Sequence, residues 1–215
     1  MGRKQREKKA RKIEEMTTLE EEMKAKANFF DPKKFFLSPI FIIFVICIVA
    51  LIAYPFVSQK YFPQGKYAIL ETSEGNIKIE LRADKAPKTV ANFVSLAKSG
   101  FYKNMIWHRV VKGFVIQTGD PTGTGTGGAG RQVNDEISDL NFTAGIVGMA
   151  NAGANTNDSQ FFITTVDGQT SLNGKYTSFG QVVEGMDVVK KIEATPTDSN
   201  EKPLSPVYLK SVILK

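Results

Sequence analysis

Few residues of this 215-residue chain could act as a nucleophile, a general base or a metal ligand. His108 is its one histidine, and no Gly-x-Ser-x-Gly turn accompanies it, so a serine–histidine–aspartate triad is not indicated. Cys47, its one cysteine, lies in an apolar run and permits neither an intrachain disulfide nor a zinc site. We therefore interpret His108 as a packed or surface histidine of a strand, and we expect no metal and no cofactor.

The glycine-rich stretch at 123–128 contains the pattern Gly-x-Gly-x-x-Gly. A dinucleotide-binding fingerprint needs a helix directly after this pattern, within a βαβ unit. Here Ala129, Gly130 and Arg131 follow, and then an acidic loop. We interpret the stretch as a flexible wall beside a groove and not as a phosphate cradle.

Four further segments stand in order along the chain: WHRVVKGFVIQTGD at 107–120, MANAG at 149–153, NTNDSQFFI at 155–163 and LNGKYTSFG at 172–180. Together they resemble the cyclophilins, and the likeness covers about residues 66–215. The resemblance implies a mainly β fold, a closed eight-stranded antiparallel β-barrel with two helices. It also implies a proline-binding groove on the outer surface and peptidyl-prolyl cis–trans isomerase activity.

The motifs carry the family's functional residues onto this sequence. Arg109 takes the place of the catalytic cation. The resemblance implies that the proline pocket is lined by Phe114, Val115, Phe162 and Leu172. It implies that the substrate backbone is hydrogen-bonded by Gln117, Asn151 and Gln160, and that the neighbouring side-chain site is bordered by Ala150 and Ala152. Tyr176 stands where many relatives carry histidine. Val115 replaces a common methionine, and Ser171 stands where many relatives have Trp or Phe. Cyclosporin binding is therefore expected to be possible but weakened.

The physical chemistry of the reaction agrees with this assignment. Rotation about a peptide C–N bond faces a barrier of about 18–20 kcal/mol, and no covalent bond is made or broken. A hydrogen-bond donor aimed at the prolyl nitrogen helps, because the nitrogen lone pair becomes available only as the amide twists. The guanidinium of Arg109 is always charged and presents rigid donors. By strand alternation we expect Trp107, Arg109 and Val111 on one face, and His108 and Val110 on the other.

Two other functions compete with the enzyme. One is a module that binds proline peptides, or a holdase chaperone, with incidental catalysis, and the other is a membrane scaffold, which would predict a damaged groove. The complete motif set, with Arg109 present, favours an isomerase that acts on proline-containing polypeptides. From residue 58 onward the chain contains 17 basic and 15 acidic residues, so its charge is nearly balanced and no nucleic-acid partner is indicated.

The elements that must position these residues are short. Alternating residues at 67–72 and 76–81, around Ser73-Glu74-Gly75, predict a hairpin. Pro87, apolar residues on one face and Gly100 predict a helix over 88–99. Strands are expected at 106–111, 114–118, 146–150, 161–165, 179–183 and 207–214, with a short helix at 186–193.

The N-terminal part has another character. Residues 40–57 carry no charge, and 18 helical residues reach roughly 27 Å, close to the hydrocarbon thickness of a bilayer. We interpret 35–57 as one transmembrane helix in contact with membrane lipid; the alternatives are a cleaved signal peptide and a buried core helix. Residues 1–34 hold 11 Lys and Arg against 7 Asp and Glu. They would form a basic cytoplasmic tail, solvated as a helix or disordered.

This interpretation divides the chain into the tail at 1–34, the transmembrane helix at 35–57, a linker at 58–65 and an isomerase domain at 66–215. The protein would be a single-pass protein of the cell membrane, with its isomerase domain outside the cytoplasm. There it would accelerate X–Pro isomerisation during the folding of proteins at or beyond the membrane.

Overall fold

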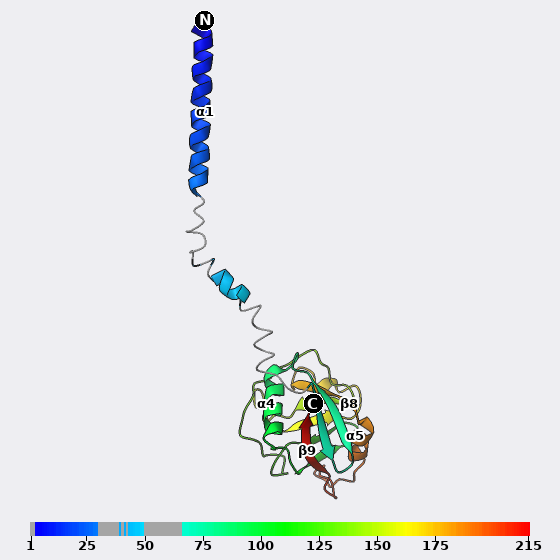
Figure 1. The fold of residues 1–215 in the computed structure, drawn as a ribbon. Coiled ribbons are helices and arrows are strands. Elements are labelled where there is room, and N and C mark those ends of the chain that lie inside the picture. Colours follow the sequence, from blue (N-terminus) through cyan, green and yellow to red (C-terminus); the bar gives the residue numbers. More distant parts are fainter. Residues whose placement is uncertain (1–2, 30–38, 40, 42, 50–65) are drawn as a thin grey trace. The chain divides into compact units, whose positions relative to one another are not determined.

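The structure, a computed structural model, describes residues 3–29, 39, 41, 43–49 and 66–215. The chain divides into two units, Met1–Tyr61 and Phe62–Lys215 (Figure 1). In the first unit, α1, Arg3–Phe29, is a helix of 27 residues. Its side chains at 11–24 are all exposed, and most of them are Lys, Arg, Glu or Thr, with Ile13, Met16, Leu19 and Met23 as exposed apolar exceptions. Of the two expectations for the tail, the solvated helix is the one observed.

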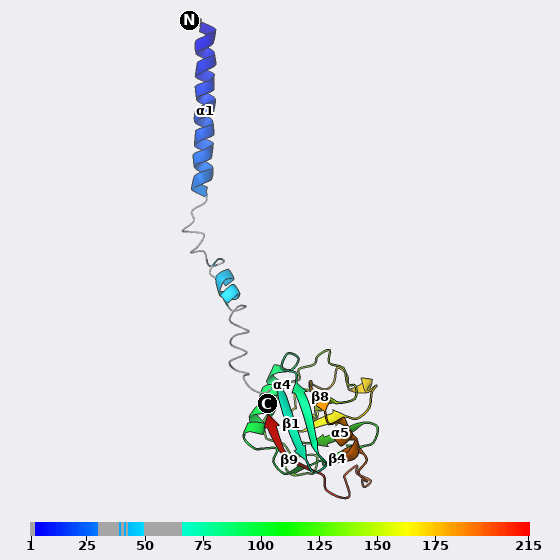
Figure 2. The ribbon, with the colours of Figure 1, turned by 45° about the vertical axis from the view of Figure 1, so that its right-hand side comes forward.

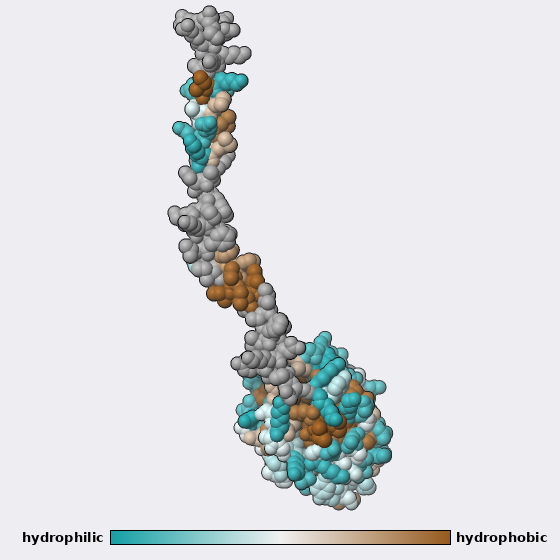
Figure 3. All heavy atoms as spheres, in the orientation of Figure 1, coloured by the Kyte–Doolittle hydropathy of each residue, from teal (hydrophilic) through white to brown (hydrophobic). Residues whose placement is uncertain are grey.

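The expected transmembrane helix over 35–57 is contradicted. Within the described part of the chain, no helix is long and apolar enough to cross a membrane. Residues 39, 41 and 43–49 are helical, and the rest of 35–57 lies outside the described residues. Residues 43–49 include exposed apolar side chains (Figure 3). The expected single-pass membrane location and the expected contact with lipid both depended on this helix, so neither is supported.

In the second unit, the chain begins with the hairpin that the alternating pattern predicted. Strand β1, Tyr67–Thr72, pairs antiparallel with β2, Asn76–Leu81. Every second residue of each strand is buried, which is the burial expected for a sheet with one face on the core. The turn closes through the Thr72 amide, which donates to the Gly75 carbonyl at 3.0 Å.

Two helices accompany the sheet. Helix α4, Pro87–Lys98, begins with proline in its first turn, where a missing N–H costs little. The backbone amides of Lys88 and Thr89 donate to the carboxylate of Glu136, so a distant loop caps this helix. Helix α5, Met186–Glu193, has the bounds that the sequence predicted. A short 3-10 helix, η1, spans Thr170–Leu172.

The remaining strands are β3 (Met105–Ile106), β4 (Arg109–Val111), β5 (Val115–Thr118), β6 (Ile146–Met149), β7 (Phe161–Thr164), β8 (Ser178–Glu184) and β9 (Tyr208–Leu214). With the hairpin they form one sheet of nine strands in the order β3-β9-β1-β2-β8-β6-β7-β5-β4 (Figure 2). Every pairing is antiparallel.

The sheet is an open half-barrel, so the expected closed barrel of eight strands is wrong. Strands β3 and β4 are its two edges, and among the described residues no ladder joins them. The reason is local: a single strand was expected over 106–111, but Trp107 and His108 leave the strand conformation and divide it in two. The first part pairs with β9 and the second with β5, so the chain crosses from one edge of the sheet to the other.

This break also corrects the expected alternation. Trp107 is completely buried in the main core, and Val110 belongs to the same cluster. Arg109 and Val111 point to the opposite face, where Val111 packs against a second apolar cluster. Trp107 and Arg109 therefore do not share a face, because the two-residue period is lost where the strand is interrupted.

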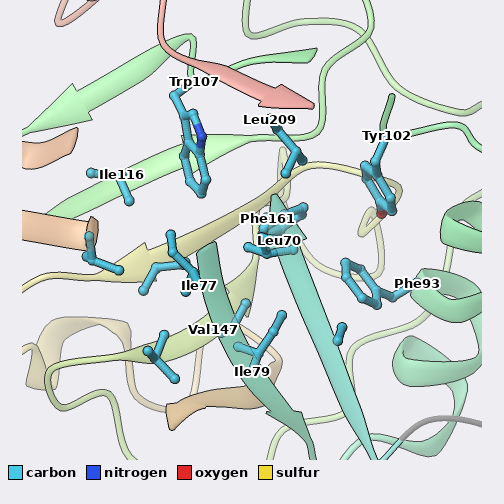
Figure 4. Close-up of a cluster of buried hydrophobic side chains, with 14 of the residues drawn as sticks. Leu70, Ile77, Ile79, Phe93, Tyr102, Trp107, Ile116, Val147, Phe161 and Leu209 are labelled. Carbon is cyan, nitrogen blue, oxygen red and sulfur yellow. The ribbon is translucent and has the colours of Figure 1, made fainter. Parts of the chain in front are cut away.

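The main core lies on the concave side of the half-barrel. Side chains from the strands, from α4 and from the break at Trp107 point toward one another in Figure 4, among them Leu70, Ile77, Phe93 and Phe161. Phe93 and Tyr102 pack around Phe161, with ring centroids 5.5 and 5.6 Å from it in edge-on contacts. Helix α5 adds Val188, Val189 and Ile192 to the same cluster. The core holds the strands so that their opposite face can carry a site.

Candidate active site

The site begins with one row of residues across four strands. Arg109 on β4 lies opposite Gln117 on β5, and Gln117 lies opposite Phe162 on β7. Phe162 in turn lies opposite Gly148 on β6. Directly opposed residues in an antiparallel sheet project to the same face about 5 Å apart. The register of these four strands therefore places a cation, an amide and an aromatic ring side by side on the outer face.

An apolar hollow adjoins this row. Its floor is the second hydrophobic cluster, in which Val115, Phe142, Ile146, Phe162 and Leu172 are buried. The hollow has a volume of about 330 Å³, and its lining also includes Phe114, Ala150 and Tyr176. The rest of its lining is polar and includes Arg109, Gln117 and Asn151, so the hollow can take a small apolar ring on one side and hydrogen-bond a polar group on the other.

The aromatic side chains of the hollow hold one another in place. Phe162 stacks on Phe142 with ring centroids 5.5 Å apart and meets Tyr176 edge-on at 5.6 Å. The stack depends on Gly148, because a Cβ atom there would lie 2.6 Å from atoms of both phenyl rings. The glycine that ends the cross-strand row thus provides the space for the ring of Phe162.

Arg109 is held from two sides at the rim of the hollow. Its Nε donates to Oε2 of Glu201 at 2.6 Å, and its Nη1 donates to Oε1 of Gln117 at 3.3 Å. The amide of Gln117 donates in turn to Oε1 of Gln160 at 2.8 Å. Arg109 keeps 37% of its side chain exposed, so the cation faces solvent and the groove. The arrangement can present a fixed donor next to an apolar pocket.

The glycine-rich loop forms the next part of the wall. Gln160 donates to the carbonyls of Gly125 and Gly127, at 3.0 and 2.8 Å. The carboxylate of Asp120 accepts from the backbone amides of the loop, including Gly125 at 2.6 Å and Gly127 at 3.2 Å. Burial alone would raise the pKa of Asp120, but hydrogen bonds from Thr122, Gly127 and Gly125 lower it well below its ordinary value. The loop lines the hollow through Thr124 and Gly125, as a groove wall would, and this buried carboxylate anchors it; the flexibility expected of the wall stays a prediction.

A second hollow of about 410 Å³ continues from the first along this loop. The two share Gln117, Gly125, Ala150 and Asn151 as lining residues. Ala152 and Gln160 line the second hollow only. Every residue carried over from the motifs therefore lines one of two adjoining hollows, which together make a groove on the outer face.

Several residues of the groove were not expected. His108 and Asn200 line the first hollow, and Glu201 reaches Arg109 from the loop between α5 and β9. His108 is not in a strand; it is 5% exposed, and burial lowers the pKa of its imidazole, so the ring is neutral at pH 7. The run Asp198-Ser199-Asn200 is rich in turn-forming residues, but no spacing in the sequence connects it with Arg109.

The comparisons with known proteins agree with this geometry. The family described as cyclophilin type peptidyl-prolyl cis-trans isomerase/CLD matches residues 67–213. The chain therefore belongs to the cyclophilin-type family, and it is an isomerase enzyme.

Individual relatives are similar over most of their own length. Peptidyl-prolyl cis-trans isomerase ppi1 of Schizosaccharomyces pombe is 53% identical over 151 residues, which cover 67% of this chain and 97% of that protein. Peptidyl-prolyl cis-trans isomerase CYP18-2 of Arabidopsis thaliana is 48% identical over 145 residues, covering 65% and 88%. A solved cyclophilin-type isomerase of Cryptosporidium parvum, crystallised in the presence of the dipeptide Ala-Pro, has a TM-score of 0.67 and 41% identity over 69% of this chain and 98% of its own.

Proposed function

We propose that the groove accelerates X–Pro isomerisation in polypeptide chains, with Arg109 as the catalytic residue. The observation that carries this proposal is the position of the Arg109 guanidinium. It is held by Glu201 and Gln117 at the rim of an apolar hollow. Residues 66–215, which contain both hollows and the whole sheet, are then the isomerase domain. The expected setting at or beyond a membrane is not part of the proposal.

The hollow would bind the proline ring and hold it still. Phe114, Val115, Phe162 and Leu172 supply apolar surface, and Tyr176 supports the ring of Phe162. Val115 is smaller than the methionine common at this position and is itself buried, so this wall remains apolar. Once the ring is fixed, the acyl side of the X–Pro bond is the part that rotates.

The polar part of the groove would hold the substrate backbone on either side of that bond. Gln117 and Gln160 are linked to each other and to the loop carbonyls, so their amide groups are oriented before substrate arrives. Asn151 extends the polar edge toward the second hollow, where Ala150 and Ala152 leave room for a neighbouring side chain. Fixed groups need no reorganisation during the reaction, which is the condition for electrostatic catalysis.

Arg109 would stabilise the twisted amide. Resonance occupies the prolyl nitrogen lone pair in the planar states, and twisting the C–N bond returns this pair to the nitrogen. A donor aimed at the nitrogen therefore binds the transition state better than either planar isomer. Because the interaction exists only in the twisted state, it raises kcat and does not merely tighten binding. No covalent intermediate and no proton transfer are needed.

The test replaces Arg109 and measures isomer exchange on a short Ala-Pro peptide by NMR. We expect Arg109→Ala to lower kcat/KM by roughly 10²–10³-fold, about 2.7–4 kcal/mol, the usual cost of one transition-state donor. Arg109→Lys should restore only part of the rate, because an ammonium lacks the planar fork. Circular dichroism should show an unchanged fold, since Arg109 is partly exposed.

Retention of more than about half the activity in a folded Arg109→Ala protein would exclude Arg109 as the catalytic residue. Tight peptide binding by the unmodified protein without faster exchange would instead support the alternative function, a proline-binding module or holdase.

A further inference from the structure

The loop between α5 and β9 is docked against the strand that carries Arg109. The backbone amide of Val110 donates to the carbonyl of Glu201 at 2.7 Å. Strand β4 pairs with β5 on one side only, so this bond lies on its outer, unpaired edge. The backbone of Glu201 is thus fixed next to Arg109 independently of the side-chain ion pair.

The loop has its own internal support. The carboxylate of Asp198 accepts from the amides of Asn200 at 2.8 Å and Lys202 at 3.0 Å. An isolated β-bridge joins Thr197 to Pro203 at its base. The ammonium group of Lys202 reaches across to the carbonyl of Gly123 in the glycine-rich loop, at 3.4 Å. These bonds fix the backbone position of residue 201 without any help from the ion pair that its side chain makes.

Glu201 occupies a backbone conformation that disfavours it. Its φ is +64°, in the left-handed region. Among the described residues, the other non-glycine positions with positive φ are Asn104 and Asn155. Asparagine tolerates this region, whereas other residues with a Cβ pay about 1–2 kcal/mol for it. Glycine would fit the turn without this cost. A glutamate in this position is explained if its carboxylate is needed.

The carboxylate and Gln117 together fix the guanidinium plane. Glu201 accepts from Nε, and Gln117 accepts from Nη1. Within the described residues, Nη2 has no hydrogen-bond partner, so its two N–H groups, together with the second N–H of Nη1, remain as donors for a substrate. With only the Gln117 bond, the guanidinium could rotate about its long side chain, and that bond at 3.3 Å is the weaker of the two.

We infer that Glu201 is a positioning residue for the isomerase reaction, which orients Arg109 so that its free donors face the groove. This inference rests on the proposed role of Arg109. Glu201 is not one of the residues that line the hollow, and it contacts the lining through Arg109. It therefore acts on the twisted amide only through Arg109. Removing it should lower kcat and leave the affinity for the ground-state peptide nearly unchanged.

The main experiment compares three substitutions in the full chain by exchange NMR on the Ala-Pro peptide. Glu201→Gln keeps the size but weakens the bond to Nε, and we expect kcat to fall about 5–20-fold with KM within twofold. Glu201→Asp keeps the charge on a shorter side chain, so part of the loss should be recovered. Glu201→Gly should lower kcat at least as much as Gln. Its melting temperature should nevertheless stay equal or rise, because the left-handed strain is relieved.

A matched control breaks an arginine–carboxylate pair elsewhere. Arg82 donates from Nε and Nη2 to the carboxylate of Asp84, at 2.8 and 2.7 Å, and neither residue lines a hollow. Asp84→Asn should leave kcat and KM unchanged.

A spectroscopic measurement reports on the orientation directly. The Arg109 Nε–H resonance, assigned by its loss in Arg109→Lys, should be shifted and slow to exchange with water in the unmodified protein. In Glu201→Gln it should move toward the position of solvent-exposed arginines.

The possible outcomes separate the two proposals. If Arg109→Ala is inactive while Glu201→Gln and Glu201→Gly keep more than half of kcat, the positioning role is wrong and the proposed function stands. If Glu201→Gly is unfolded, or if the three variants raise KM without lowering kcat, Glu201 is structural or contacts the peptide, and the inference is again wrong. If Arg109→Ala remains active, the proposed catalytic role fails first.

Discussion

Strands β5 and β7 serve two apolar clusters, one on each face. Ile116 and Phe161 point into the main core, while Val115 and Phe162 belong to the cluster beneath the groove. Burial does not separate the two faces, because Phe161 is 0% and Phe162 only 4% exposed. The two residues differ in their neighbouring side chains. Gln117 lies opposite Phe162, whereas the neighbours of Phe161 are the rings of Phe93, Tyr102, Trp107 and Phe179.

This comparison shows how a site can be built on a sheet without weakening it. The inner cluster is enclosed by strands and two helices and holds the register. The outer cluster is covered on one side only, so it keeps a hollow for a ligand. Polar residues at the same face, Arg109, Gln117 and Gln160, are tolerated there because each has a partner and some exposure.

The difference between the inner and the outer cluster is tested most directly by truncating the two adjacent phenylalanines separately. Phe161→Ala opens a cavity in the closed core, and we expect a loss of about 3–5 kcal/mol in the free energy of unfolding. Phe162→Ala should cost less stability, about 1–3 kcal/mol, because solvent and neighbouring side chains can enter the space. Its main effect should be on peptide binding, with KM raised together with a lower kcat/KM. Urea denaturation and exchange NMR measure the two quantities.

A reversed pattern, with Phe162→Ala the more destabilising and still active, would mean that the outer cluster is the structural core and the hollow is not the proline pocket.

A smaller effect is expected at the carboxylate that anchors the groove wall. The folded-state pKa of Asp120 is lowered, so the unfolded chain takes up this proton at a higher pH than the folded protein does. The stabilisation is fully present above the unfolded pKa of about 4 and is lost as the pH falls further. Asp120→Asn should therefore cost about 2 kcal/mol or more at pH 7 and reduce the loss of stability below about pH 5.

Urea denaturation at several pH values measures this dependence, with Asp84→Asn as the control, because exposed ion pairs contribute little. Parallel pH curves for Asp120→Asn and the unmodified protein would show that Asp120 does not hold the loop by its charge.

The smallest expected change concerns the rim of the groove. Ser171 lies exposed in η1, directly before the buried Leu172. Without an indole at this position the rim lacks a flat contact surface and a donor, so cyclosporin should inhibit weakly. Ser171→Trp should tighten inhibition about tenfold, roughly 1.4 kcal/mol, with kcat for the peptide nearly unchanged. Nanomolar inhibition of the unmodified protein would show that residue 171 does not form this part of the rim.

Local patterns in the sequence were sufficient for much of the fold. The hairpin at 67–72 and 76–81 and the helix at 186–193 have the predicted bounds, because alternation and helical periodicity depend on residues close in the chain. Local patterns do not determine whether the sheet is open or closed. That depends on what Trp107 and His108 do between two short strands, and the residue types from 106 to 111 give no sign of a break.

At the apolar run 40–57 the sequence predicted a structural element that the described residues do not contain. Hydropathy and length predicted a transmembrane helix, and the described residues contain no helix that meets the requirement. Hydropathy and length measure how apolar a segment is and how far it could reach, but neither determines by itself whether the segment forms a spanning helix.

The sequence by itself determined which residues gather at the groove: each position carried over from the four motifs lines one of the two hollows. Only the tertiary structure decided how Arg109 is held. Its carboxylate partner, Glu201, is 92 residues away in the chain and belongs to a loop with no recognisable motif. A strand pattern specifies which face a side chain takes, but the contact of a loop with an edge strand depends on the whole course of the chain between them. For that reason the proposed catalytic cation could be named from the sequence, and its anchor could not.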